Sequence, residues 1–246
     1  MKMHDIVMTI PAYEPTAELE PFIRALLPDF RHVLVVDDGS RRATACFERV
    51  RKIQGVTVVT HPENRGKGAA LKTAFAEILR RFPDATGTVT ADADGQHRAE
   101  DVIKVADSLT RNPDRISLGV RTFGSDTPWR SRLGNLWTCG EFFLLTGAAV
   151  RDTQTGLRGL PTSLLPKLLT LPGDRYEYEI RMLTAAVLSA QKPLQVPIAT
   201  VYSDGNSSSH FRPLVDTWRT QTALFSTAVT GWFGRKAREP SPAISS

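Results

Sequence analysis

Apolar and polar positions alternate along the first hundred residues with two different periods. Short continuous apolar runs predict buried strands at residues 6–10, 33–36, 56–60 and 88–90. Between them, apolar residues recur every three or four positions and predict helices at residues 15–27, 44–53 and 68–81. This alternation predicts an α/β fold with a mostly parallel central sheet, whose faces are covered by crossover helices.

The second part of the chain keeps both periods but alternates them less regularly. It predicts helices at residues 101–110, 132–145, 160–169, 177–190 and 215–233. It also predicts strands at residues 116–120 and 194–200, and a Ser-rich loop at residues 203–213. We therefore expect a single domain over residues 1–236, ending in an amphipathic helix at 215–236, and a disordered polar tail at 237–246.

A polar cluster follows each of the four early strands directly. The clusters are residues 11–14 (Pro-Ala-Tyr-Glu), 37–40 (Asp-Asp-Gly-Ser), 64–68 (Asn-Arg-Gly-Lys-Gly) and 92–96 (Asp-Ala-Asp-Gly-Gln). Parallel α/β sheets bind their ligands at the carboxyl ends of the strands. The four clusters therefore predict one binding site along one edge of the sheet.

The fourth cluster has the composition of a metal site. On an extended segment Asp92, Asp94 and Gln96 project to the same side. Oxygen ligands select Mg²⁺ or Mn²⁺, which share their coordination with substrate phosphates. The alternative is an ordinary solvated Asp-Gly turn. Carboxylates crowded on one edge with Asp37 and Asp38 repel one another unless a cation neutralises them, which favours the metal site.

The second and third clusters each allow two interpretations. Asp37 and Asp38 could cap a helix, or accept hydrogen bonds from a base or ribose. In residues 64–68, two glycines would let a ligand approach the backbone, and the helix N-terminus favours an anion; the alternative is a flexible basic loop. The phosphate-loop pattern is absent, and no Gly-x-Gly-x-x-Gly follows the first strand, which disfavours a dinucleotide-binding oxidoreductase.

Guanidinium groups that could bind phosphate lie in the second half of the chain. Arg121, Arg130 and Arg132 fall between a strand and the following helix. The loop at residues 206–212 offers hydroxyls, an imidazole and a guanidinium. Ser209 with its neighbour His210 is disfavoured as a nucleophilic pair, because adjacent side chains rarely face each other and no orienting carboxylate is evident.

Composition and charge narrow the location and the partners. The two cysteines form no disulfide framework, and the sequence shows neither a signal peptide nor a membrane-spanning run, so we expect a cytoplasmic protein. The net charge of +5 favours polyanionic partners. The basic residues are dispersed without interleaved aromatics, which disfavours nucleic acid. The helix at 215–233, followed by basic residues, could lie on the inner face of the cell membrane, or pack on its own domain or a partner.

Taken in order, these motifs resemble family 2 glycosyltransferases, and within them the polyprenyl-phosphate (dolichyl-phosphate mannosyltransferase-like) enzymes. The matching segments are residues 10–13, 35–40, 64–68, 92–97, 119–121, 152–158 and 177–179, so the resemblance covers nearly the whole chain. Glu14 stands where this family usually has Asn, and Pro15 where it usually has Glu.

The resemblance implies a GT-A fold, with a nucleotide-sugar half at residues 1–100 and an acceptor half at 101–214. It implies an inverting enzyme that moves a mannose- or glucose-type sugar from a GDP- or UDP-sugar to a polyprenyl phosphate, with Mg²⁺ or Mn²⁺. The donor would be bound by Pro11, Tyr13, Glu14, Asp37, Asp38, Lys67 and Asp92. Asp94 and Gln96 would bind the metal, and the acceptor phosphate would meet Arg121, Arg130, Arg132, Ser209 and Arg212. Of these, Asp94, Arg121 and Arg132 would act in catalysis.

The acceptor decides whether a general base is needed. A phosphate monoester is largely anionic near neutral pH, its second pKa being about 6, and needs none. A sugar hydroxyl of a glycan or glycolipid needs one, for which Asp152 and Glu179 are candidates. Two other classes share parts of the pattern: a sugar-nucleotide nucleotidyltransferase, and a non-catalytic module that binds nucleotide sugars or lipid phosphates.

Overall fold

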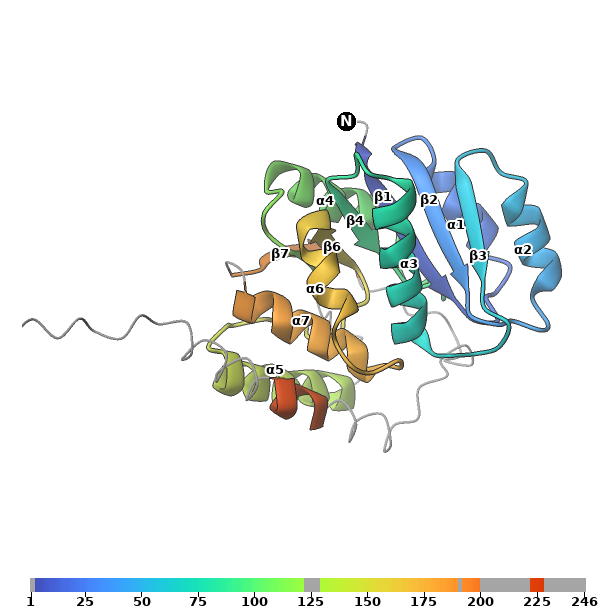
Figure 1. Ribbon diagram of the computed structural model, residues 1–246. Coiled ribbons are helices and arrows are strands. Elements are labelled where there is room, and N and C mark those ends of the chain that lie inside the picture. The colour runs from blue at the N-terminus through green and yellow to red at the C-terminus, as the bar shows by residue number, and fades with distance from the viewer. Residues whose placement is uncertain (1–2, 122–128, 190–191, 200–221, 228–246) are drawn as a thin grey trace, which may run out of the picture.

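The computed structural model describes residues 3–121, 129–189, 192–199 and 222–227 (Figure 1). The strands are β1 (Met3–Ala12), β2 (Phe30–Asp37), β3 (Val56–Thr60), β4 (Gly87–Thr90), β5 (Ser117–Arg121), β6 (Arg158–Pro161) and β7 (Leu194–Ile198). The helices are α1 (Leu19–Leu26), α2 (Thr44–Arg51), α3 (Lys67–Arg81), α4 (Ala99–Arg111), α5 (Trp129–Thr146), α6 (Leu165–Leu169) and α7 (Glu177–Ser189), with a 3₁₀ turn, η1 (Thr162–Leu164), before α6. Residues 222–227 form one more helical segment.

The described strands form one sheet in the order β3-β2-β1-β4-β6-β5-β7. β1 pairs in parallel with β2 and β4, β2 with β3, and β5 with β7. β6 runs antiparallel to both of its neighbours, β4 and β5. The expected α/β class, a mostly parallel sheet flanked by helices, is confirmed.

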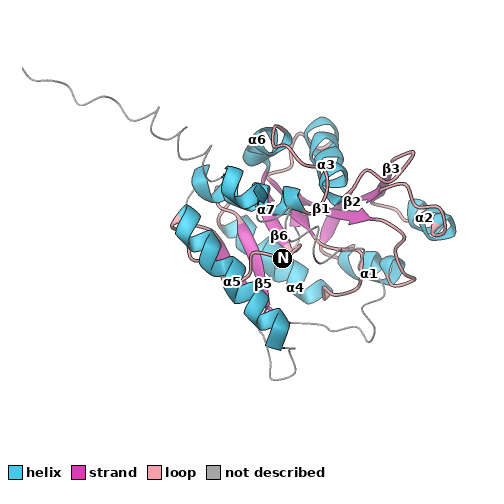
Figure 2. Ribbon diagram, turned by 90° about the horizontal axis from the view of Figure 1, so that it is seen from below, coloured by secondary structure: helices cyan, strands magenta, loops and turns pink. Residues whose placement is uncertain are grey.

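Helices cover both faces of this sheet (Figures 1 and 2). Successive residues of β1 point to opposite faces: Val7 belongs to one core cluster, and Ile6 and Met8 to the other. Helices α3, α5, α6 and α7 pack on the face of Val7, and α1, α2 and α4 on the opposite face. Because each large side chain buried in this way contributes about 1.5–3 kcal/mol, the two cores hold the sheet edge rigidly in place.

One helix prediction is wrong at its start. Residues 160–169 were expected to be helical throughout, but residues 158–161 form β6, and the helix α6 begins only at Leu165. Periodicity does not separate a short apolar run in a strand from one in a helix. The pairing of β6 with β4, which sets Arg158 beside Thr90, decided the outcome.

The first helix begins later than predicted, at Leu19, because residues 13–18 form the turn that follows β1. At the other end, residues 222–227 bury Ala223 and Leu224 in the core cluster that also contains Phe142. The rest of the predicted helix at 215–236, the Ser-rich loop at 203–213 and the tail at 237–246 lie outside the described residues. None of the helices in the described ranges is long and apolar enough to cross a bilayer.

Candidate functional site

The carboxyl ends of β1, β2, β3 and β4 lie along one edge of the sheet, as their parallel pairing requires. The register sets Ala12 beside Asp37, and Asp37 beside Thr60. The loops that leave these strands carry the four polar clusters. The prediction that the clusters share one edge of the sheet is therefore confirmed.

Glu14 joins the loops that follow β1 and β2. Its backbone φ is +47°, a left-handed conformation that residues other than glycine seldom adopt. Its N–H donates to Ser40 Oγ at 2.8 Å, and its carboxylate accepts the backbone N–H groups of residues 41–43 at 2.8 to 3.2 Å. Burial works against the charge, but these N–H groups outweigh it and lower the pKa of Glu14. Glu14 therefore anchors the loop that enters α2, beside the half-exposed Tyr13.

Asp38 holds the loop that precedes α3. Its carboxylate is 3% exposed, lies 2.7 Å from the Nδ1 of His61, and accepts the backbone N–H groups of Arg65 at 3.0 Å and Gly66 at 2.8 Å. Asp37 is buried next to it and accepts a backbone N–H within its own turn. Both acids thus stabilise the loops of the site through hydrogen bonds to backbone N–H groups. Their contact with a nucleoside stays a prediction. Pro11 is buried within β1, close to the same edge of the sheet.

The glycines at the start of α3 serve a packing function that the sequence did not reveal. A Cβ at Gly66, where φ is +104°, would lie 2.8 Å from the Cγ of Arg175. A Cβ at Gly68 would lie 2.6 Å from the Cβ of Tyr178. The segment leading into α7 therefore occupies the space that a side chain would need at both positions, and the close approach of a ligand to this backbone stays a prediction.

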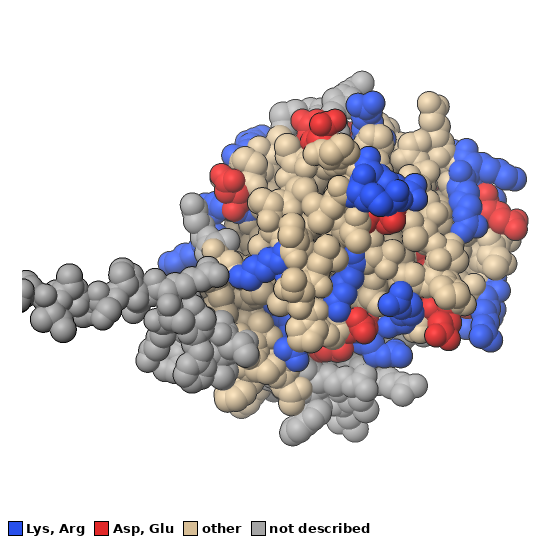
Figure 3. All heavy atoms as spheres, in the orientation of Figure 1, with Lys and Arg blue, Asp and Glu red and all other residues tan. Residues whose placement is uncertain are grey.

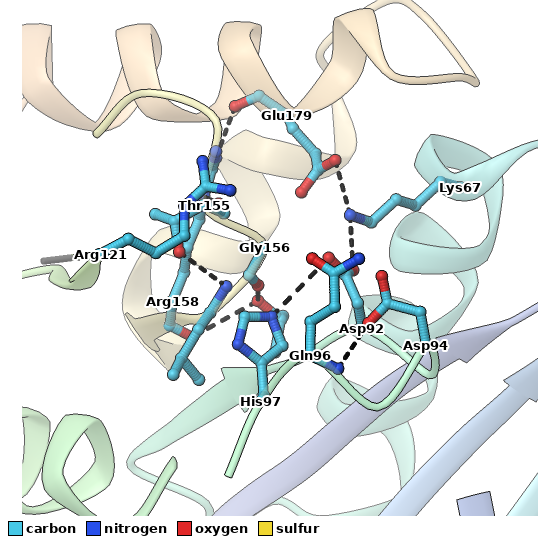
Figure 4. Close-up of polar contacts among 12 residues, drawn as sticks. Lys67, Asp92, Asp94, Gln96, His97, Arg121, Thr155, Gly156, Arg158 and Glu179 are labelled. Atoms are coloured by element: carbon cyan, nitrogen blue, oxygen red, sulfur yellow. Dashed lines mark hydrogen bonds and ion pairs between the residues drawn. The ribbon is translucent and has the colours of Figure 1, made fainter. Parts of the chain in front are cut away.

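Lys67, the first residue of α3, connects the two halves of the chain. Its ammonium lies 2.6 Å from Asp92 Oδ1 and 2.8 Å from Glu179 Oε2 (Figure 4). Burial alone would lower the pKa of Lys67, but the charges of the two carboxylates outweigh it and raise that pKa. Burial likewise opposes the charge of Asp92, yet Lys67 and His97 hold its pKa well below the usual range. Lys67 and Asp92 are therefore both charged at neutral pH.

Asp94 and Gln96 lie on the turn after β4, on the same loop as Asp92 (Figure 4). The backbone N–H of Gln96 donates to Asp94 Oδ1 at 3.0 Å. Burial and the negative charge of Asp92 raise the pKa of Asp94, and no ion pair within the described ranges supplies Asp94 with a cation. Within those ranges no three His, Cys, Asp or Glu side chains form a ready-made metal cage. Asp94 thus brings to the site a carboxylate that forms no direct ion pair with another described residue, with an amide side chain two residues away.

Segment 152–158 supports this site from behind. A Cβ added at Gly156 would lie 2.7 Å from the Cγ of Asp92, so the carboxylate can occupy this position only because residue 156 has no side chain. Arg158 is 1% exposed, and its guanidinium donates to the carbonyls of Thr155 at 2.8 Å, Glu179 at 2.6 Å and Thr153 at 3.2 Å (Figure 4). Arg158 therefore ties this segment to α7 and places a buried positive charge behind the carboxylates.

Arg121 ends β5 and is held by Asp152, which is 0% exposed. The guanidinium donates to both carboxylate oxygens, from Nε at 2.7 Å and from Nη2 at 3.1 Å. Such a two-point pair fixes the plane of the guanidinium. Of the other predicted acceptor ligands, Arg130 and Arg132 belong to α5 but their side chains are outside the described part, as are Ser209 and Arg212 altogether.

The sequence pattern predicts no role for Gly156 or Arg158, although both lie in the segment 152–158 that resembles the family. An arginine inside the run Leu157–Arg158–Gly159–Leu160 was the available signal, because a charge in an apolar run is either exposed or buried with many partners. On the face shown in Figure 3, Lys and Arg are spread among Asp and Glu instead of gathering in one patch, as the dispersed sequence positions predicted.

Comparison with known proteins connects this geometry to a family. Residues 8–162 match the family model described as glycosyl transferase family 2. An uncharacterized protein of Methanocaldococcus jannaschii is 30% identical over 210 residues, which cover 83% of this chain and 84% of that protein. The UDP-N-acetylglucosamine–dolichyl-phosphate N-acetylglucosaminyltransferase of Methanococcus voltae is 28% identical over 221 residues, which cover 81% and 86% of the two chains.

A solved structure shares the fold. The glucosyl-3-phosphoglycerate synthase of Mycobacterium tuberculosis, in complex with Mn²⁺, UDP-glucose and phosphoglyceric acid, superposes with a TM-score of 0.68 at 18% identity. The match covers 92% of this chain and 80% of that one. At this identity the likeness concerns the fold alone, and it confirms the expected GT-A architecture.

Proposed function

Because the chain belongs to glycosyl transferase family 2 and is a glycosyltransferase, we propose that it moves a sugar from a nucleoside diphosphate sugar to a polyprenyl phosphate, with inversion and with the help of a divalent metal. Membership of this family decides against the nucleotidyltransferase and the non-catalytic module that the sequence left open. The relative from Methanococcus voltae, whose name specifies UDP-N-acetylglucosamine and dolichyl phosphate, supports a lipid-phosphate acceptor and favours a UDP-sugar over a GDP-sugar.

One observation carries the choice of acceptor. Both acidic side chains that could serve as a general base are already engaged: Asp152 is paired with Arg121, and Glu179 with Lys67. A sugar hydroxyl must lose a proton as it attacks, and a carboxylate that is held by a cation is a weak base. A phosphate monoester needs no base, since it is already anionic at neutral pH. The engagement of both carboxylates therefore favours the phosphate acceptor over a hydroxyl of a glycan or glycolipid.

The donor is assigned to the loops that follow β1, β2 and β4. We assign the nucleoside to Tyr13 and Asp37, on loops whose shape is held by Glu14 and Asp38. We assign the diphosphate to the neighbourhood of Asp92 and Lys67. The Lys67 ammonium lies between Asp92 and Glu179, and its third N–H can donate to a phosphate oxygen without releasing either carboxylate.

The residues present suit a divalent metal. Mg²⁺ and Mn²⁺ are commonly held by one or two carboxylates together with substrate phosphates, so a site with few protein ligands is what such a donor requires. Asp94 offers a carboxylate whose negative charge is disfavoured by burial and by Asp92, so that a cation would stabilise it, and Gln96 offers an amide oxygen two residues away. When bound, the metal would supply Lewis-acid stabilisation of the departing diphosphate.

For this reaction the protein needs mainly to position the two substrates and to stabilise the negative charge on the leaving diphosphate. An oxygen of the acceptor phosphate attacks the anomeric carbon as the bond from that carbon to the diphosphate breaks, and the diphosphate leaves with the electron pair. Attack from the side opposite the leaving group inverts the anomeric centre. We propose that Arg121, held rigidly by Asp152, orients the acceptor phosphate, and that Lys67 stabilises the negative charge on the leaving group.

The decisive assay combines UDP- and GDP-sugars with a polyprenyl phosphate, in Mn²⁺ or in EDTA, and follows both the lipid-linked sugar and the released nucleoside diphosphate. We expect transfer only with metal, and at least about a hundredfold loss in Asp94→Ala. Asp84→Ala, an exposed acid far from this edge, is the matched control and should behave like the wild type. Near-normal turnover of Asp94→Ala would overturn the metal assignment, and transfer to sugar hydroxyls instead of lipid phosphate would overturn the acceptor.

A further inference from the structure

His61, the residue that follows β3, lies buried at the edge of the sheet to which the donor is assigned, and no step of the reaction proposed above uses it. Its side chain is 5% exposed. Its Nδ1 lies 2.7 Å from Oδ1 of Asp38, and its Nε2 lies 2.9 Å from the hydroxyl oxygen of Thr73 in α3. A buried imidazole with a partner on each ring nitrogen is held in one orientation. His61 therefore connects the end of β2 to α3 through two side-chain hydrogen bonds.

The other partners of Asp38 show which nitrogen of His61 carries the hydrogen. Oδ1 of Asp38 accepts the backbone N–H of Arg65 at 3.0 Å, and Oδ2 accepts that of Gly66 at 2.8 Å. A carboxylate only accepts hydrogen bonds, so the bond between the two side chains needs a hydrogen on Nδ1 of His61. His61 is thus a third donor to this carboxylate. Because it comes from the end of another strand, it restricts rotation of the carboxyl group about its Cβ–Cγ bond.

The two backbone groups that Asp38 accepts stand directly before Lys67, the first residue of α3. Gly66, at the N-cap position, has no side chain with which to cap this helix, and Asp38 supplies an acceptor from β2 instead. Thr73 lies in the same helix, so the hydrogen bonds run from α3 through His61 and Asp38 and back to the start of α3. This closed ring fixes where the helix begins relative to β2 and β3.

The position at which α3 begins matters for Lys67. Its ammonium lies 2.6 Å from Asp92 and 2.8 Å from Glu179, which belong to the loop after β4 and to α7 (Figure 4). The lysine side chain is flexible, so the position of its main chain decides which charges the ammonium reaches. A misplacement of about 1 Å at a reacting centre can reduce a rate about a hundredfold. The contacts that hold residues 65 and 66 therefore also place the ammonium.

We propose that His61 is a positioning residue of the transfer reaction: by orienting Asp38 it holds the start of α3, so that the Lys67 ammonium meets the diphosphate as it leaves. The action of Lys67 on the diphosphate rests on the function proposed above. The alternative is that His61 only fills space between β3 and α3. The two roles require different things of a replacement, because positioning needs a donor at the place of Nδ1, whereas packing needs only volume.

Two substitutions of His61 separate these roles. Asparagine places its amide nitrogen near the position of Nδ1 and can still donate to Asp38, whereas the longer glutamine places its amide near the position of Nε2, toward Thr73. We expect His61→Gln to lower kcat at least about tenfold and to change the donor KM less than about threefold, because Lys67 acts on charge that develops as the diphosphate leaves. His61→Asn should keep kcat within about threefold of the wild type. Equal losses in the two variants would show that only the volume of the imidazole matters, and would overturn the proposal.

A cycle with Lys67→Met tests whether the effect runs through the ammonium. Once the ammonium is absent, His61→Gln should lower kcat by less than a further factor of about two, since side chains that act through one another are not additive. A loss of the same size in both backgrounds would show that His61 acts on the fold instead, and would overturn the proposal. His32→Gln, which replaces a partly buried histidine of β2, is the matched control and should leave kcat unchanged in both backgrounds.

Binding of UDP and GDP in the presence of Mn²⁺, measured by calorimetry, needs neither acceptor nor transfer. A nucleoside diphosphate carries the charge that the leaving group acquires, so His61→Gln should weaken the complex that the wild type forms by at least about threefold, while His61→Asn should not. Weaker binding by His61→Gln, without transfer to polyprenyl phosphate by the wild type, would refute the proposed acceptor alone. Transfer by the wild type, with equal kcat and equal nucleotide binding in His61→Gln, would refute the positioning alone. A wild type that binds neither nucleotide would overturn both.

Discussion

The position of Asp92 depends on the absence of a side chain at Gly156, and replacing this glycine with alanine tests that dependence. The added Cβ would overlap Oδ2 of Asp92, its nearest neighbour, and lie 2.7 Å from the Cγ, whereas an ordinary contact begins at 3.4 Å, so the carboxylate must retreat by about 1 Å. A shift of this size away from Lys67 would lengthen the 2.6 Å ion pair between Lys67 and Asp92 to about 3.6 Å. At an effective dielectric constant of about 20, this weakens the attraction by roughly 1.8 kcal/mol.

The loss should appear in activity more than in stability. Asp92 can rotate away from the new methyl group, so we expect the free energy of unfolding to fall by no more than about 1–3 kcal/mol. Misplacing a carboxylate and an ammonium at a reacting centre should lower kcat/KM for the donor by about 10- to 100-fold. The assay is release of nucleoside diphosphate in the presence of acceptor, with thermal unfolding measured on the same preparation.

Gly140→Ala is the matched control, because a Cβ at that position meets no atom within 4 Å. It lies within α5, so the substitution should leave kcat/KM unchanged and raise stability by up to about 1 kcal/mol. A Gly156→Ala variant with kcat/KM within threefold of the wild type would show that Asp92 does not depend on the gap. A collapse of the melting temperature would show that the backbone, and not Asp92, takes up the strain.

Three further substitutions probe the supports of the site. Arg158→Gln should cost about 3–5 kcal/mol of unfolding free energy, since buried carbonyls lose their donor and nearby carboxylates their counter-charge; a urea midpoint close to that of the wild type would contradict the buried role. Glu14→Gln should lose stability in full above the unfolded pKa of about 4.3, and progressively less as the pH falls from there through the lowered pKa of Glu14 in the folded protein; equal urea midpoints of the two proteins from pH 3 to 7 would refute this. Asp152→Asn should raise the acceptor KM about tenfold by releasing Arg121 while kcat changes little, whereas loss of kcat with loss of the acidic limb of its pH profile would identify Asp152 as a base.

Local signals in the sequence were enough for the first half of the fold. The alternation of apolar runs with helical periods predicted β1 to β4 and the helices between them to within a few residues. Because ligands bind at the carboxyl ends of parallel strands, the sequence also predicted that four polar clusters share one edge of the sheet. These inferences succeed because the period of apolar residues and the turn after a strand depend on near neighbours in the chain.

The second half was less predictable, because its pairings join distant residues. β6 is an antiparallel strand inserted between two strands that are far from it in sequence, and its apolar run fits the start of a helix equally well. The position of β6 places Gly156 against the carboxylate of Asp92 and buries Arg158 next to the same segment. No periodicity in residues 152–158 contains that information.

The sequence by itself determined the fold class, the family and the chemical types available at the strand ends: carboxylates, an amide, an ammonium and guanidinium groups. The tertiary structure decided which partner each of them has. The carboxylates of Glu14 and Asp38 accept backbone N–H groups, and Lys67 lies between Asp92 and Glu179. Gly66 and Gly68, at the start of α3, leave room for the segment that leads into α7. The physical reason is that charge pairing and steric fit act between atoms a few ångströms apart in space, however far apart their residues lie in the chain.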